Sequence, residues 1–147
     1  MAIRGVRGAI QVDEDTPEAI TSATKILLEA ILAANPSLAA PDLASAFFTL
    51  TADLNATYPA LAARELAGWT TVPLLCGSEL SVPGGMPRCL RVLLHWNTEL
   101  AQNDVRHAYL GSAARLRPDL KRGDPTSPDF SPNGVPGFSM AEEGADS

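Results

Sequence analysis

The chain has 147 residues, of which 46% are hydrophobic and 19% charged, and this fits a single globular domain and excludes most multidomain enzymes. The 11 basic and 17 acidic residues give a net charge of −6, which repels polyanions, so a nucleic-acid partner is not expected. Only 5% of the residues are aromatic, so we expect a modest core and regard a self-associating subunit as plausible.

A strand is predicted first, over residues 2–12. Apolar and small residues alternate there, with Val6 and Ile10 on one face and Arg7 and Ala9 on the other. Arg4 lies three residues before Arg7 and is therefore expected on the opposite face.

A long helix is predicted next. Asp15 or Thr16 can cap it, Pro17 suits its first turn, and Asn35-Pro36 ends it. Apolar residues at helical spacing form its inward stripe, which consists of Ile20, Ala23, Leu27, Ile31 and Ala34.

Shorter elements follow in the middle of the chain. Residues 45–50 are predicted as a strand, and residues 60–66 as a short helix with Gly68 as its C-cap. Residues 72–76 are predicted as a strand that ends at a Gly-Ser-Glu turn.

The strongest strand pattern covers residues 89–98. Leu90, Val92, Leu94 and Trp96 share one face, and Arg91 lies in the middle of the other face. Residues 105–110 are predicted as a last short strand. Five strands with one long and one short helix indicate an α+β domain with a mixed β-sheet.

We expect the folded domain to span residues 1–120. Pro, Gly and Ser supply 12 of the 27 residues from 121 to 147, which predicts a flexible tail without a core of its own. The tail is either a solvated extension or a cover over a site.

The two cysteines, Cys76 and Cys89, do not form a CxxC pair, and His95 and His107 do not form a ligand cluster with them, so no metal site is expected. The N-terminus lacks the apolar run of a secretory signal, and no apolar stretch is long enough to cross a membrane. We therefore expect a cytoplasmic protein with reduced thiols and no membrane partner.

Arg91 and Arg7 are the main candidates for an anion site. An Arg between Leu90 and Val92 in a strong strand is costly to bury unless an anion faces it. A structural salt bridge to a Glu on the next strand, or simple exposure on a polar face, would explain it equally. The same explanations, an anion site, a structural salt bridge or simple exposure, apply to Arg7.

Glu79 follows Cys76 by three residues, at a strand end where side chains can converge on a pocket. A lone carboxylate is also a common surface group, and Cys76 is more simply explained as a buried thiol than as a nucleophile. The chain contains no P-loop, GxGxxG, HExxH or GxSxG motif.

Five segments in order carry a specific resemblance over residues 2–120: RGVRGA, YPALAARELAGW, VPLLCGSE, GGMPRCLRV and RHAYLGSAARLRPDL. They resemble the AroH class of bacterial monofunctional chorismate mutases. The resemblance implies a pseudo-α/β-barrel homotrimer with active sites at the subunit interfaces. It also implies the conversion of chorismate, a small dicarboxylate, to prephenate in phenylalanine and tyrosine biosynthesis, with no cofactor or metal.

The same resemblance implies roles for individual residues. Arg91 would stabilise the charge that develops on the ether oxygen, Glu79 would accept a hydrogen bond from the ring hydroxyl beside Cys76, and Arg7 would hold a carboxylate with help from Tyr109. An adjoining subunit would supply the residues that wall the ring, namely Tyr58, Ala60, Arg64 and Leu116. Arg117 and Asp119 would shape the pocket edge.

This sequence departs from the family pattern at Leu61, where a Lys is usual, and at Tyr58, where a Phe is usual. Two alternatives lack this chemistry. One is a non-catalytic trimeric module that binds small carboxylates at its interfaces with the same arginines. The other is a purely structural oligomerisation domain, which predicts no cleft.

Overall fold

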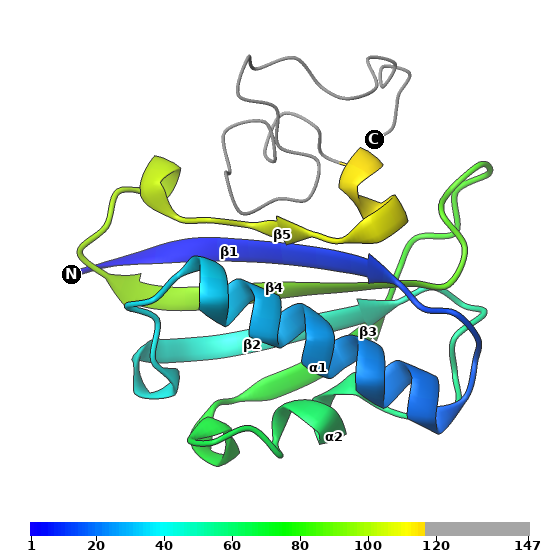
Figure 1. Cartoon of the computed structure of the whole chain (residues 1–147), viewed down its shortest axis with the longest axis horizontal. Helices are drawn as coiled ribbons and strands as arrows, with labels where there is room; N and C mark the ends of the chain where they lie inside the picture. The colour runs from blue at the N-terminus through cyan, green and yellow to red at the C-terminus, as the bar shows by residue number, and fades with distance from the viewer. Residues whose placement is uncertain (117–147) are drawn as a thin grey trace.

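The computed structural model describes residues 1–116, in which five strands form one mixed sheet. The order across the sheet is β3-β2-β4-β1-β5. The strands are β1 (Ala2–Gln11), β2 (Leu43–Leu50), β3 (Leu74–Ser78), β4 (Cys89–Thr98) and β5 (Ala108–Tyr109). Helices α1 (Pro17–Ala34) and α2 (Pro59–Ala63) lie on one face of this sheet (Figure 1). The expected α+β class is confirmed.

Strand β4 organises the sheet because it pairs along its full length. It is antiparallel to β1, from Ala2 opposite Thr98 to Gln11 opposite Cys89, and antiparallel to β2 on its other side. Strand β3 adds to β2 in parallel, and β5 adds to β1 in parallel. The alternation predicted for β4 is present, since the residues on its helix-covered face are all buried: Leu90, Val92, Leu94 and Trp96.

The main core lies between α1 and this face of the sheet. Fully buried side chains of α1, such as Leu27 and Ile31, belong to one cluster with fully buried side chains of the strands, such as Val6, Phe48 and Leu94. Gly8 of β1 lies under the helix, where a Cβ atom would be 2.9 Å from Cδ1 of Ile31 and 3.1 Å from the carbonyl oxygen of Ala108. Glycine therefore allows α1 to approach the sheet closely.

The ends of α1 follow the prediction. Oγ1 of Thr16 accepts the backbone N–H of Ala19 at 3.1 Å, as an N-cap does, and Pro17 occupies the first turn. At the other end, the Asn35 side chain accepts the Arg106 N–H and donates to the Arg106 carbonyl, each at 2.9 Å. Asn35 thus ends the helix and ties it to the segment that leads into β5.

The bounds of the shorter elements differ from the predictions, and β2 already begins at Leu43 instead of residue 45. The helix predicted over residues 60–66 covers only Pro59–Ala63, because Glu65 and Leu66 donate to the residue three positions back rather than four. Gly68 is left-handed, with φ of 80°, but it precedes a 3₁₀ turn at Trp69–Thr71 instead of capping α2.

The two short strands also differ from expectation. The strand predicted over residues 72–76 begins only at Leu74, after Pro73, which has no N–H to donate. It continues through the expected turn, and the Glu79 N–H still bonds the Leu50 carbonyl at 3.0 Å. Of residues 105–110, only Ala108 and Tyr109 form a strand, because the preceding backbone is bonded to side chains such as that of Asn35.

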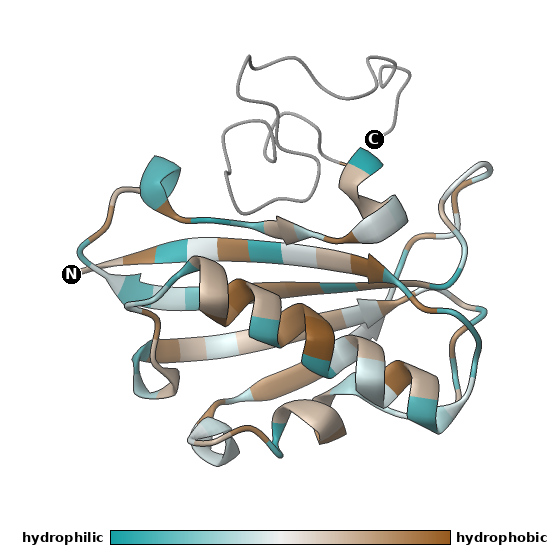
Figure 2. Ribbon diagram, viewed as in Figure 1, coloured by the Kyte–Doolittle hydropathy of each residue, from teal (hydrophilic) through white to brown (hydrophobic). Residues whose placement is uncertain are grey.

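The opposite face of the sheet carries no helix. Its register places Arg7, Arg91 and Thr49 together, with apolar residues that are partly or largely exposed: Ile3, Phe47, Leu75 and Leu93. Figure 2 shows the arginines of β1 as hydrophilic segments between pale and hydrophobic ones. Within residues 1–116, no helix is both long and apolar enough to cross a membrane.

Candidate active site on the helix-free face

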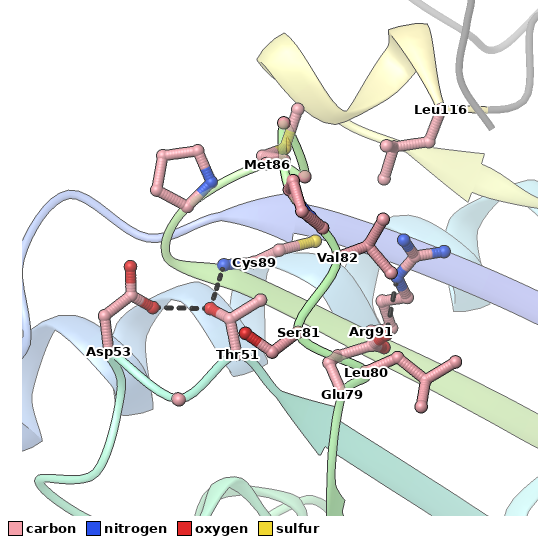
Figure 3. A pocket seen from close by; sticks show the side chains of 15 residues that line it. Thr51, Asp53, Glu79, Leu80, Ser81, Val82, Met86, Cys89, Arg91 and Leu116 are labelled. Atoms are coloured by element: carbon pink, nitrogen blue, oxygen red, sulfur yellow. Dashed lines mark hydrogen bonds and ion pairs between the residues drawn. The ribbon is translucent and has the colours of Figure 1, made fainter.

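A cavity of about 670 Å³ opens on the helix-free face (Figure 3). It lies where β2 and β4 meet, under the loop that follows Glu79, and Leu116 closes one side. Its lining includes polar side chains from the strand ends and apolar ones from the loop, among them Thr51, Asp53, Glu79, Val82, Met86, Cys89, Arg91 and Leu116.

Arg91 and Glu79 face each other in this cavity. Nε of Arg91 lies 3.1 Å from Oε2 of Glu79, and the two side chains are 31% and 20% exposed. The Nε–H is not directed at the carboxylate, so the contact is an ion pair and not an aligned hydrogen bond. The far end of the guanidinium points away from Glu79, toward Leu116 (Figure 3).

A residue of β2 also bonds the Glu79 carboxylate. The Thr49 hydroxyl donates to the same Oε2 atom that Arg91 approaches, and Thr49 is paired with Arg91 across the β2–β4 ladder. The prediction allowed a structural ion pair with a Glu on the next strand. The partner is instead Glu79, which follows β3. Strand β2 lies between β3 and β4, so the Glu79 side chain reaches Arg91 across Thr49 of β2. Sequence reasoning did not identify Thr49.

Arg7 and Tyr109 lie on the same face as Arg91, although neither lines the cavity. Arg7 is paired with Leu93, and Ala9 is paired with both Arg91 and Tyr109, so Arg7 and Arg91 are diagonal neighbours. Such neighbours have Cα atoms about 7–8 Å apart. Tyr109 is 2% exposed, and the Arg7 backbone N–H donates to Nδ1 of His107 at 3.0 Å.

Apolar side chains line the cavity next to Arg91. A second buried cluster on this face contains Ala9, Cys89, Tyr109, Ala113 and Ala114, with Met86 and Leu116 packed against it. Burial raises the pKa of the Cys89 thiol, against the opposing effect of the Arg91 guanidinium. The Cys89 thiol is therefore uncharged where it lines the cavity. The sequence analysis did not place Cys89 in the site.

The structure keeps other predicted residues apart from this cavity. Cys76 is paired with the buried Phe48, so its side chain lies on the helix-covered face and packs against the main core. Tyr58, Ala60 and Arg64 lie at α2 and do not line the cavity, and Tyr58 is 68% exposed.

Two further expectations concern the C-terminal side. Leu116, expected from an adjoining subunit, lines the cavity of its own chain. Arg117, Asp119 and the tail over residues 121–147 lie outside the described residues.

A guanidinium fixed in apolar surroundings can stabilise negative charge that develops in a reaction, because it needs little reorganisation. Among the described residues that line the cavity there is no His or Lys, and the one cation is Arg91. Glu79 and Asp53 supply the negative charges. This arrangement suits electrostatic stabilisation better than proton transfer through a histidine.

Comparison with known proteins agrees with this chemistry. Residues 3–120 match the family model described as chorismate mutase type I. The chain is 53% identical over 119 residues to a protein named chorismate mutase AroH from Thermus thermophilus, which covers 81% of this chain and 97% of the relative. It is 44% identical over 120 residues to chorismate mutase AroH from Bacillus subtilis (strain 168), covering 82% and 94%.

A solved structure is similar as well. It is a chorismate mutase from Clostridium thermocellum, 40% identical in sequence, with a TM-score of 0.72. The match covers 76% of this chain and 98% of that one.

Proposed function

The chain belongs to the type I, or AroH, family of chorismate mutases and isomerises chorismate to prephenate, and we propose that Arg91, Glu79 and Arg7 carry out this reaction on the helix-free face. The step leads toward phenylalanine and tyrosine. The observation that supports the site is the Arg91–Glu79 ion pair, which lines a cavity on the helix-free face at the ends of the strands.

Arg91 is proposed to stabilise the transition state. The rearrangement breaks an ether C–O bond ahead of C–C bond formation, so negative charge builds on the ether oxygen. The two terminal nitrogens of Arg91 point into the cavity, while Nε faces Glu79 (Figure 3). A donor held in this way binds the transition state more tightly than the substrate, which raises kcat.

Glu79 is proposed to orient both Arg91 and the substrate ring. Its Oε2 atom is occupied by Thr49 and Arg91. Its Oε1 atom, which makes neither contact, is then the acceptor for the ring hydroxyl. Cys76 can take part only through its backbone, since its side chain faces the main core.

Arg7 is proposed to bind a carboxylate of the substrate, with Tyr109 beside it. Arg7 lies one diagonal step from Arg91 on the same sheet face. Two guanidinium groups at that separation can contact different ends of one dianion, and this would hold the ether in the folded conformation that bond formation needs.

We propose that the active protein is a homotrimer with interfacial sites. The support is the helix-free face, where Ile3 and Leu75 are 58% and 66% exposed and Phe47 is 36% exposed. Such a surface is typical of an interface. A neighbouring subunit would bring Tyr58 and Arg64 to the cavity. The proposed location is the cytoplasm, which agrees with the two free cysteines.

A complementation experiment tests the interfacial site. Arg91→Ala and Arg64→Ala are each expected to be nearly inactive as homotrimers. After joint refolding, random assortment in a cyclic trimer gives about a quarter of the sites both arginines, so about a quarter of wild-type activity should return. If activity does not rise above that of the separate variants, each site lies within one chain.

The alternative of a non-catalytic module that binds carboxylates is not favoured by the family membership. Under that alternative, Arg91→Ala would weaken carboxylate binding, and neither the variant nor the wild type would convert chorismate. Direct observation of chorismate disappearance in the wild-type protein separates the two functions.

A further inference from the structure

Two side chains near the cavity fix the start of β4. The Thr51 hydroxyl accepts the Cys89 backbone N–H at 2.9 Å and donates to Oδ1 of Asp53 at 2.6 Å. The Asp53 carboxylate in turn accepts the Arg88 backbone N–H, with N···O distances of 3.1 and 3.0 Å. Thr51 and Asp53 therefore bond the backbone of Cys89, the first residue of β4, and of Arg88 just before it (Figure 3 shows the contacts of Thr51).

Arg88 needs this support because its backbone is left-handed. Its φ is 48°, and it is the one non-glycine residue with positive φ within residues 1–116. A side chain in that conformation is disfavoured and persists only where surrounding contacts hold it. Arg88 is also bonded to Val12, through Nε at 2.8 Å and through its carbonyl at 2.7 Å, so three chain segments meet there.

The left-handed residue lies three positions before Arg91. Thr51, Asp53, Cys89 and Arg91 all line the same cavity. A change of backbone conformation at Arg88 would rotate the first residues of β4 and would move the Arg91 guanidinium relative to Glu79.

We propose that Asp53 is a positioning residue for the rearrangement. It holds Arg88 in its left-handed conformation and thereby fixes the direction of the Arg91 guanidinium. This inference rests on the role proposed above for Arg91.

A direct contact between Asp53 and substrate is the competing explanation. The Asp53 carboxylate already accepts hydrogen bonds from Thr51 and Arg88, and its negative charge opposes a dianionic substrate. If Asp53 bound substrate, its replacement would change KM first. If it positions Arg91, the replacement changes kcat, because the guanidinium acts in the transition state.

The experiment compares Asp53→Ala and Asp53→Asn in the full chain by steady-state kinetics, with folding checked by circular dichroism. Asp53→Ala should lower kcat by about tenfold to a hundredfold, the range for a catalytic group displaced by up to about 1 Å, with KM little changed. Asp53→Asn, whose carbonyl can still accept from Thr51 and Arg88, should restore most of kcat. Asp13→Ala, which removes an exposed carboxylate close to Val12, is the matched control and should keep wild-type kinetics.

A double-mutant cycle with Arg88→Gly tests the mechanism, since glycine adopts positive φ readily. Asp53→Ala should cost much less kcat in the Arg88→Gly background, and equal costs in the two backgrounds would overturn the proposal. Wild-type kcat in Asp53→Ala would overturn it as well. If Asp53→Ala does not fold, Thr51→Val replaces it, with the same expected loss of kcat and the same contradicting outcome.

Arg91→Ala is measured alongside. If Arg91→Ala keeps wild-type kcat, the site assignment is wrong. If Arg91→Ala loses activity while Asp53→Ala keeps it, only this inference fails.

Discussion

Nε of Arg91 on β4 lies 3.1 Å from Oε2 of Glu79, although Glu79 follows β3, which is not next to β4 in the sheet. Strand β2 separates them, and its Thr49 hydroxyl donates to the same Glu79 oxygen. The position of the guanidinium is thus constrained in the absence of any ligand, as the proposed role of Arg91 requires. Orientation in advance is what electrostatic stabilisation of a transition state requires.

Replacing Arg91 by Ala should therefore affect the chemical step most. We expect Arg91→Ala to lower kcat by at least about a hundredfold, the cost of removing one preorganised donor to a developing oxyanion. The measurement is the rate of chorismate disappearance at saturating substrate. Arg4→Ala, which removes a guanidinium from the opposite sheet face, is the control and should keep wild-type kcat. Near-wild-type turnover in Arg91→Ala would contradict the proposed role.

Replacing Glu79 by Gln should have a smaller effect. The amide keeps the volume and can still accept from Thr49, but the ion pair with Arg91 is lost. Hydrogen bonds to a charged group contribute about 1.5–3 kcal/mol, and the bond from Thr49 and the proposed bond from the ring hydroxyl both lose their charged acceptor, so kcat/KM should fall by about tenfold to a hundredfold. Glu99→Gln, at an 85% exposed side chain, should leave kcat/KM unchanged. A Glu79→Gln loss equal to that of Arg91→Ala would mean that the two residues act only as a unit.

Local patterns predicted most of the fold. Strand β4 has the predicted bounds because its alternation is uninterrupted, and α1 begins after Thr16, one of the two predicted caps. The boundaries of β3 and β5 could not be predicted in the same way. They depend on which backbone groups find a partner on a distant segment, as the Arg106 N–H does on Asn35.

The part of the site on β2 was harder to predict. Alternation within the predicted strand over residues 45–50 separates Thr49 from Phe48, but it does not show which strands lie on either side of Thr49. In the structure Thr49 is paired with Gly77 of β3 and with Arg91 of β4, and its hydroxyl donates to Glu79 on the helix-free face. The strand patterns singled out Arg91 and Glu79 as candidates and the family resemblance supplied their roles, whereas Thr49 and Cys89 required the register.

The proposed trimer predicts the effect of a charge on the helix-free face. Leu75→Glu would bury an unpaired carboxylate in the interface, at a cost of about 3 kcal/mol or more. We expect the variant to sediment as a monomer with reduced kcat/KM. Ile26→Glu, which changes a 50% exposed residue on α1, should remain trimeric. A trimeric and active Leu75→Glu would place the interface elsewhere.

We expect the Asp53 carboxylate to make a pH-dependent contribution to the free energy of unfolding. The hydrogen bond from Thr51, followed by that from the Arg88 N–H, lowers the pKa of Asp53. Because the folded-state pKa lies below the unfolded value of about 3.9, the stabilisation is complete above that pH and is lost as pH falls through the folded value. The melting temperature of the wild type should exceed that of Asp53→Asn at pH 7, and the difference should shrink below about pH 4. An equal difference at pH 3 and pH 7 would contradict this explanation.

We expect the fold to tolerate an added methyl group poorly at Gly8. A Cβ atom there would lie 2.9 and 3.0 Å from the Cδ1 atoms of Ile31 and Leu27 and 3.1 Å from the Ala108 carbonyl oxygen. The side chains can shift, but the carbonyl belongs to the backbone next to β5. Gly8→Ala should therefore lower the free energy of unfolding by about 1–3 kcal/mol, as overpacking does.

Gly5 is the matched control for this substitution, on the same strand. Its Cβ atom would meet only Cδ1 of Leu93, at an ordinary 3.7 Å. Gly5→Ala should be neutral or should stabilise the protein by about 0.5 kcal/mol, since alanine loses less backbone entropy on folding. Denaturant unfolding of both variants measures the difference. Equal stability of the two would show that α1 can move away from β1 at little cost, and that the close approach at Gly8 does not set the distance between helix and sheet.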